Sequence, residues 1–128
     1  DTRESAAIYI CRDLLSERAR LKIYDPQVSE QQIREDLAAQ FCGPDGRITD
    51  SGQALLDENV EVVDSCAAAA EQSHAIAVLT EWDEFQTVNL DRIVASMQRP
   101  AFLFDGRNVI NRDAAVEKGF EFHGIGKP

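Results

Sequence analysis

Short apolar segments alternate with stretches of helical periodicity along the sequence, and this alternation constrains the fold more than any other feature. The apolar segments predict β-strands over residues 21–25, 60–63, 75–79, 101–104 and 120–125. The helical patterns predict helices over residues 1–19, 29–41, 64–73, 90–98 and 113–118. Strands separated by helices form βαβ units, whose strands pair in parallel. We therefore expect a single α/β domain of three layers, α/β/α, around a doubly wound, mostly parallel sheet.

Two segments carry more detailed expectations about burial. "AIAVL" at 75–79 is apolar throughout, which indicates a strand covered on both faces, and "AFLF" at 101–104 is likewise expected to be buried. By contrast, "CGPDGRITDSGQ" at 42–53 contains turn residues and is expected to form a surface loop.

The composition excludes several classes of function. Thirteen Lys and Arg residues against 23 Asp and Glu give a net charge of −10, which repels a nucleic-acid backbone. The apolar runs are too short to cross a bilayer, so no membrane partner is expected. Cys11, Cys42 and Cys66 form no CxxC pair, which argues against a disulfide framework or a zinc site and favours a reducing, cytoplasmic setting. His74 and His123 stand apart from other metal-ligating residues, so no metal site is predicted.

Polar residues follow three of the predicted strands, at the edge where an open parallel sheet binds its ligands. The three segments are Tyr24-Asp25, Thr80-Glu81-Trp82 and Asp105-Gly106-Arg107.

Arg107 is the strongest candidate binding residue in these segments. Gly106 has no Cβ, so a ligand can approach the backbone, and the guanidinium offers a fork of donors suited to phosphate. From the residues alone, an equally good alternative is a solvated loop arginine that pairs with Asp105 or Glu81.

Arg3 is the second candidate. It lies in the first turn of the first predicted helix, where the helix dipole disfavours a cation. A helix N-terminus combined with an arginine can hold a phosphate, although an ion pair with Glu4 is the commoner arrangement. No complete catalytic set is found in the sequence, so no residue is assigned a catalytic role.

Five stretches, taken in order, resemble the UDP-glucose/GDP-mannose dehydrogenase family in its C-terminal, UDP-binding domain. They are "DTRES" at 1–5, "IYDP" at 23–26, "TEWDEF" at 80–85, "PAFLFDGRNV" at 100–109 and "GIGK" at 124–127. The resemblance covers nearly the whole chain, and the doubly wound, Rossmann-like fold expected above agrees with it. By this resemblance, Arg107 matches an arginine that contacts the UDP-sugar, and Arg3 matches an arginine that contacts NAD.

The resemblance implies a part of an NAD-dependent enzyme that oxidises UDP-glucose to UDP-glucuronate. In the family, an N-terminal Rossmann domain carries NAD, and a central domain supplies the nucleophilic cysteine and the catalytic lysine. Neither domain is in this sequence, which begins with Asp1 rather than Met. Residues 1–128 are therefore expected to be the UDP-binding domain without its first strand, inactive by itself. The implied partners are UDP-glucose and the other domains and subunits of the enzyme, which in animal-type members usually form a hexamer.

A stand-alone doubly wound module with a regulatory or protein-interaction role is the alternative hypothesis. Receiver-like domains have this size and acidity, and they hold a metal with acids at strand ends, where Asp25 and Asp105 are available. Binding of UDP that is lost in an Arg107→Ala variant would separate the two hypotheses.

Overall fold

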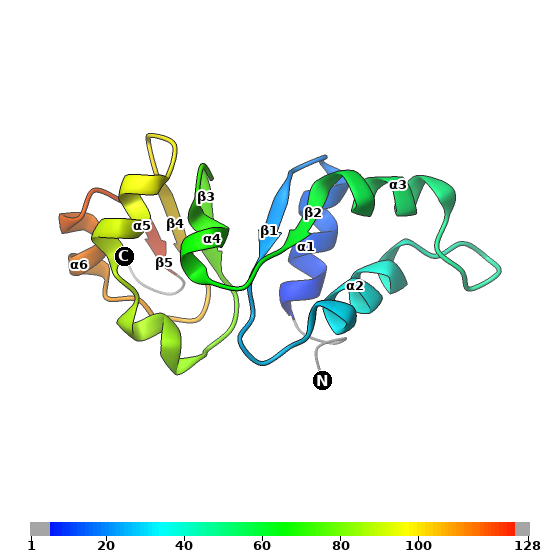
Figure 1. Ribbon diagram of the computed structural model, residues 1–128, viewed down its shortest axis with the longest axis horizontal. Coiled ribbons are helices and arrows are strands. Elements are labelled where there is room, and N and C mark those ends of the chain that lie inside the picture. Colours follow the sequence, from blue (N-terminus) through cyan, green and yellow to red (C-terminus); the bar gives the residue numbers. More distant parts are fainter. Residues whose placement is uncertain (1–5, 125–128) are drawn as a thin grey trace. The chain divides into compact units, whose positions relative to one another are not determined.

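The computed structural model describes residues 6–124, which divide between Asp64 and Ser65 into two compact units (Figure 1). Each unit has its own small sheet, and every paired strand in these sheets runs parallel to its neighbour. The α/β class and the parallel pairing predicted from the sequence are therefore confirmed.

The N-terminal unit is built around a two-stranded parallel sheet. Strand β1 pairs with β2 so that Leu21 lies opposite Val60 and Ile23 opposite Val62. The elements are helices α1 (Ala6–Ser16), α2 (Glu30–Ala38) and α3 (Asp50–Asn59), the 3₁₀ helix η2 (Ala39–Phe41), and strands β1 (Leu21–Ile23) and β2 (Val60–Val62). Apolar side chains from the three α-helices and β2 form its core, namely Ile8, Leu15, Ile33, Leu37, Leu56 and Val60.

Helix α3 corrects the prediction of a surface loop over residues 42–53. Thr49 caps the helix, because its hydroxyl oxygen accepts the N–H of Gly52 at 3.0 Å, and Leu56 buries the inner face. Gly52 was interpreted as a loop residue, but it allows α3 to approach η2 closely. A Cβ at this position would lie 2.7 Å from Cβ of Phe41. The turn residues at 43–46 do form a turn, and the prediction failed only where the helix begins.

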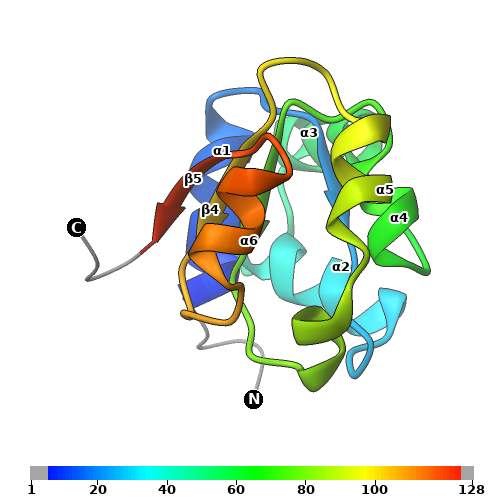
Figure 2. The same cartoon turned by 90° about the vertical axis from the view of Figure 1, so that its left-hand side faces the viewer.

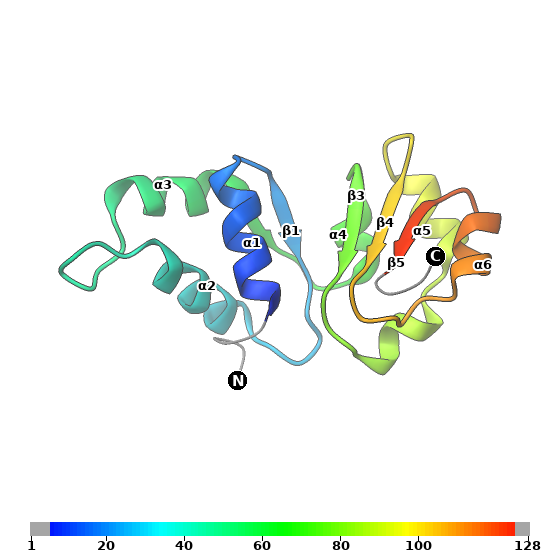
Figure 3. The same cartoon turned by 180° about the vertical axis from the view of Figure 1, so that it is seen from behind.

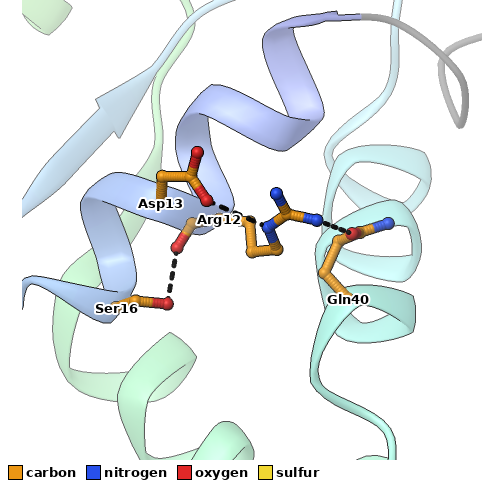
Figure 4. A network of polar contacts seen from close by, with 4 residues as sticks. All are labelled: Arg12, Asp13, Ser16 and Gln40. Carbon is orange, nitrogen blue, oxygen red and sulfur yellow. Dashed lines mark hydrogen bonds and ion pairs between the residues drawn. The ribbon is translucent and has the colours of Figure 1, made fainter.

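A set of polar contacts joins α1 to η2 (Figure 4). Arg12 donates from Nε to Asp13 Oδ1 at 3.1 Å and from Nη1 to Gln40 Oε1 at 3.4 Å. The Ser16 hydroxyl donates to the backbone oxygen of Arg12 at 2.9 Å. This guanidinium is therefore occupied by structural contacts within its own unit.

The C-terminal unit contains a three-stranded parallel sheet in the order β3-β4-β5 (Figure 3). Helices α4 and α5 lie side by side, and α6 packs against β5 (Figure 2). The elements are helices α4 (Cys66–Ala70), α5 (Leu90–Ser96) and α6 (Arg112–Glu117), the 3₁₀ helix η3 (Asp83–Thr87), and strands β3 (Ala75–Val78), β4 (Phe102–Asp105) and β5 (Glu121–Gly124).

Each α-helix of this unit begins with a side-chain cap. Ser65 caps α4 and confirms one of the two residues, Asp64 or Ser65, expected there from the sequence. Asn89 caps α5 and Asn111 caps α6 in the same way. Because these caps are local, they explain why the short helices were readable from the sequence. None of the helices in the described part of the chain is long and apolar enough to cross a membrane.

The expectations that β3 is buried on both faces and that β4 is buried are wrong for alternate residues of each strand. Burial alternates along the strands: Leu103 is buried, whereas Ala75 and Ala77 are exposed and Phe104 is 44% exposed. The Phe104 ring stacks on His123 of β5 with 5.1 Å between the ring centroids. The physical reason is that, within the C-terminal unit, one face of the sheet is covered and the other face is left accessible.

Candidate functional site

The strands of the C-terminal unit end together at one edge of their sheet. In the parallel register, Val78 of β3 lies opposite Asp105 of β4, and Asp105 lies opposite Gly124 of β5. The N–H of Gly106 donates to the backbone oxygen of Val78 at 2.9 Å, which fastens the loop after β4 to the end of β3. Two of the three predicted ligand-binding segments, 80–82 and 105–107, are therefore brought together as expected.

Arg107 projects from this edge and pairs with the segment that follows β3. Its Nη2 donates to Oε1 of Glu81 in an ion pair whose side chains are 48% and 58% exposed, respectively. This pairing with Glu81 is the contact that the sequence left open as an alternative to ligand binding. Since exposed ion pairs contribute little free energy, a ligand anion can compete for the guanidinium.

Asp105 is the residue whose importance the sequence interpretation missed. Its side chain is only 1% exposed. One carboxylate oxygen, Oδ1, accepts the N–H of Arg107 at 3.0 Å, and the other, Oδ2, accepts those of Val109 and Ile110 at 2.8 and 2.6 Å. An aspartate directly before a glycine at a strand end was the available signal, because aspartate side chains bond to nearby backbone N–H groups in turns.

The loop also contains a residue in the left-handed region. Asn108 has a φ of 61°, a conformation that asparagine adopts more readily than most side chains. With Gly106 bonded to Val78 and three further N–H groups bonded to Asp105, the backbone around Arg107 is held in one conformation.

The other candidates from the sequence are Arg3, Tyr24, Asp25 and Trp82. Arg3 falls outside the described residues. Tyr24 and Asp25 follow β1 in the N-terminal unit, where Oδ1 of Asp25 accepts the N–H of Gln27 at 2.8 Å. Trp82, next to Glu81, is half-buried, and within residues 6–124 its buried indole N–H has no hydrogen-bond partner.

Two of the three thiols are poor nucleophiles at neutral pH, because their pKa values are raised. Burial raises the pKa of Cys11 to about 11. Burial also raises the pKa of Cys66 to about 11, with a further contribution from Glu84, whose Oε2 lies 3.9 Å from Sγ. All three cysteines are free, and Cys42 is exposed. Over residues 6–124, no group of three or more His, Cys, Asp or Glu residues could hold a metal ion.

These features define a Rossmann-like α/β chain that presents a guanidinium at the strand ends, where this class of fold binds its ligands. The chain belongs to the UDP-glucose/GDP-mannose dehydrogenase family, since the model of that family's UDP binding domain matches residues 1–112.

Similar proteins agree with this membership. The chain is 44% identical to UDP-glucose 6-dehydrogenase 5 of Oryza sativa subsp. japonica, and 45% identical to UDP-glucose 6-dehydrogenase 1 of Arabidopsis thaliana. It is 43% identical to UDP-glucose 6-dehydrogenase 1 of Glycine max. Each alignment covers 100% of this chain but only 27% of the relative. The chain therefore corresponds to about a quarter of the length of these relatives.

Proposed function

We propose that this chain binds the nucleotide part of a UDP-sugar, with Arg107 as the contact to its phosphates. The observation that carries the proposal is the half-exposed guanidinium at the aligned ends of β3 and β4, in a chain that belongs to a UDP-binding family. Arginine suits this task because its fork of N–H donors matches phosphate oxygens and its charge opposes theirs.

The reaction is proposed for a longer protein that carries this chain. The similar proteins are named UDP-glucose 6-dehydrogenases, which supports an NAD-dependent oxidation of UDP-glucose to UDP-glucuronate. In that setting this chain contributes a substrate-binding group, and the nucleophile and the NAD fold come from other domains. By itself the chain is expected to be inactive, and the raised pKa values of Cys11 and Cys66 support this.

NAD is the proposed cofactor of that longer protein, and Arg3 is the proposed contact from this chain. The sequence contains no GxGxxG fingerprint, so the described residues do not fit a complete dinucleotide site. A cytoplasmic setting and a homo-oligomer, such as a hexamer, complete the proposal, and the three free cysteines fit a reducing compartment.

The domain boundary is part of the same proposal. Residues 1–128 are proposed to be the C-terminal UDP-binding domain without its first strand. Within the N-terminal unit β1 pairs with β2, and within the C-terminal unit β3 pairs with β4. The support for this boundary is the model of the family's UDP binding domain, which matches residues 1–112.

The experiment that tests the function is calorimetric titration of UDP into the 128-residue chain and its Arg107→Ala variant, with UMP and NAD as comparison ligands. The expected result is weak binding with UDP preferred over UMP, and loss of that binding in the variant. UDP binding of equal strength to the variant would show that the site assignment is wrong. If the wild-type chain binds no UDP, the proposal fails for this chain alone, and the same pair of proteins is compared in a longer protein that contains it.

A further inference from the structure

We propose that Asp105 is a positioning residue that fixes the backbone of residues 106–110, so that Arg107 is presented ready to bind an anion. The inference rests on the proposed function, because it assigns Asp105 an effect that acts through Arg107. It assigns a role to a buried side chain that does not itself touch the ligand.

The burial of Asp105 first requires an explanation. An aspartate side chain is seldom fully buried unless its oxygens are bonded, because removing a carboxylate from water is costly. Here both oxygens have partners, and all three partners are backbone N–H groups of one short loop. The buried carboxylate therefore stabilises the conformation of that loop.

The loop conformation in turn determines where Arg107 can reach. The N–H of Arg107 is bonded to Asp105, while the N–H of Gly106 just before it is bonded to Val78. The side chain of Arg107 is half exposed and reaches Glu81 from this fixed stretch of backbone. Fixing the backbone in advance reduces the conformational freedom that ligand binding would otherwise have to remove.

An Asp105→Asn variant tests this arrangement with almost no change in volume. An amide has one oxygen and one NH₂ group, so it cannot accept all three N–H groups in the present geometry. Whichever way the amide is turned, its NH₂ faces at least one backbone N–H donor. An Asp105→Ala variant loses all three bonds, so the effects are expected to increase from wild type to Asn to Ala.

The experiment measures two quantities for each variant of the 128-residue chain. The first is the dissociation constant for UDP, and the second is the hydrogen-exchange rate of the amides of Arg107, Val109 and Ile110. For Asp105→Asn we expect UDP to bind about tenfold more weakly or worse and these amides to exchange at least about tenfold faster. The matched control is Ile93→Val, which trims a buried residue of α5; it is expected to leave the dissociation constant for UDP within twofold and to speed exchange of the three amides no more than that of the amides of α5.

A second pair of variants guards against loss of folding in the Asp105 variants. Asn108 is exposed and has a φ of 61°, which glycine tolerates and valine does not. Both substitutions remove the asparagine side chain, so any direct contact that it makes is lost equally. Asn108→Val is expected to loosen the loop and weaken UDP binding several-fold relative to Asn108→Gly.

The outcomes separate this inference from the function on which it rests. If Arg107→Ala abolishes UDP binding while Asp105→Asn and Asn108→Val bind UDP like the wild type, the positioning role is overturned and the proposed function stands. If Arg107→Ala binds UDP like the wild type, both are overturned. Unchanged exchange of the three amides in Asp105→Ala would likewise overturn the positioning role.

Discussion

The guanidinium of Arg107 is held against the carboxylate of Glu81, which lies 26 positions earlier in the chain. The register of β3 and β4 produces this pairing, because it places the two loops that follow these strands at the same edge. If Arg107 binds a phosphate as proposed, Glu81 competes with that phosphate for the same guanidinium.

Glu81→Gln is predicted to strengthen UDP binding. The substitution removes a competing negative charge, and exposed ion pairs of this kind contribute at most about 1 kcal/mol, so the gain is up to about fivefold. Titrations at low and high salt check the cause, because the difference between the two proteins should shrink as ionic strength rises. Weaker binding by Glu81→Gln at every salt concentration would show instead that Glu81 orients the guanidinium.

Arg107→Ala is predicted to weaken UDP binding by about tenfold to a hundredfold, the range for losing hydrogen bonds to charged groups. Its free energy of unfolding should change by less than about 1 kcal/mol, because the pair with Glu81 is exposed. The matched control is Arg99→Ala, which removes the same charge from an exposed position at the amino end of β4. An equal loss of UDP binding in the control would point to net charge rather than to a contact.

Alkylation of the thiols is predicted to begin at Cys42. This side chain is exposed, whereas the pKa values of Cys11 and Cys66 are raised to about 11, and the thiolate is the form that reacts. Brief treatment of the folded chain with iodoacetamide at pH 7.5, followed by peptide mass spectrometry, measures the order. Modification of Cys66 ahead of Cys42 would contradict the prediction.

The raised pKa of Cys11 also predicts how stability depends on pH. Between its ordinary pKa of 9.0 and the folded value of about 11, the unfolded chain has lost the thiol proton and the folded chain retains it. The contribution of this group is therefore fully present below pH 9 and is lost as pH rises toward 11. Denaturant midpoints of wild type and Cys11→Ala across this range isolate the effect, since other groups titrate equally in both proteins. Parallel curves for the two would refute it.

Gly52→Ala is predicted to destabilise the N-terminal unit by about 1 to 3 kcal/mol, the usual cost of overpacking. The added methyl group would come within 2.7 Å of Cβ of Phe41, which outweighs the gain in helix propensity. The free energy of unfolding is measured in urea, with Ser51→Ala, an exposed position in the same turn, as the control. A neutral or stabilising result would mean that α3 and η2 can separate without cost.

The sequence predicted those elements whose signals are local. Strand β4 breaks at Asp105-Gly106, and Ser65 caps α4, so a short window was sufficient for both. Helix α3 was missed because Gly52 weakens a helical pattern. A glycine stands at this position because Phe41 of another element, η2, lies too close to leave room for a Cβ. The accessible face of the three-stranded sheet was missed for the same kind of reason, since apolar composition does not reveal which neighbours are present.

At the candidate site the division is similar. The sequence predicted that Arg107 follows a strand and a glycine, and that it could pair with Glu81. The three backbone bonds of Asp105 were not readable, because they depend on the path of the loop through Val109 and Ile110. Whether Arg107 meets a ligand remains a prediction for the titrations described above.

The isolated chain is predicted to be poorly stable or to self-associate. If the domain lacks its first strand, as proposed, its sheet exposes apolar surface and unpaired backbone groups that another copy can pair with. Sedimentation velocity over a range of concentrations, together with thermal melting, checks this. A cooperative, monomeric chain with a high melting temperature would count against the assignment of a missing strand.

Self-association of this kind would also affect how any titration of this chain should be interpreted. If copies associate through unpaired strand edges, the population competent to bind UDP changes with total protein concentration. By mass action, the apparent affinity for UDP and the melting temperature would then both drift with dilution, although no atom of the site had changed. Each dissociation constant is therefore best measured at several protein concentrations and extrapolated to infinite dilution.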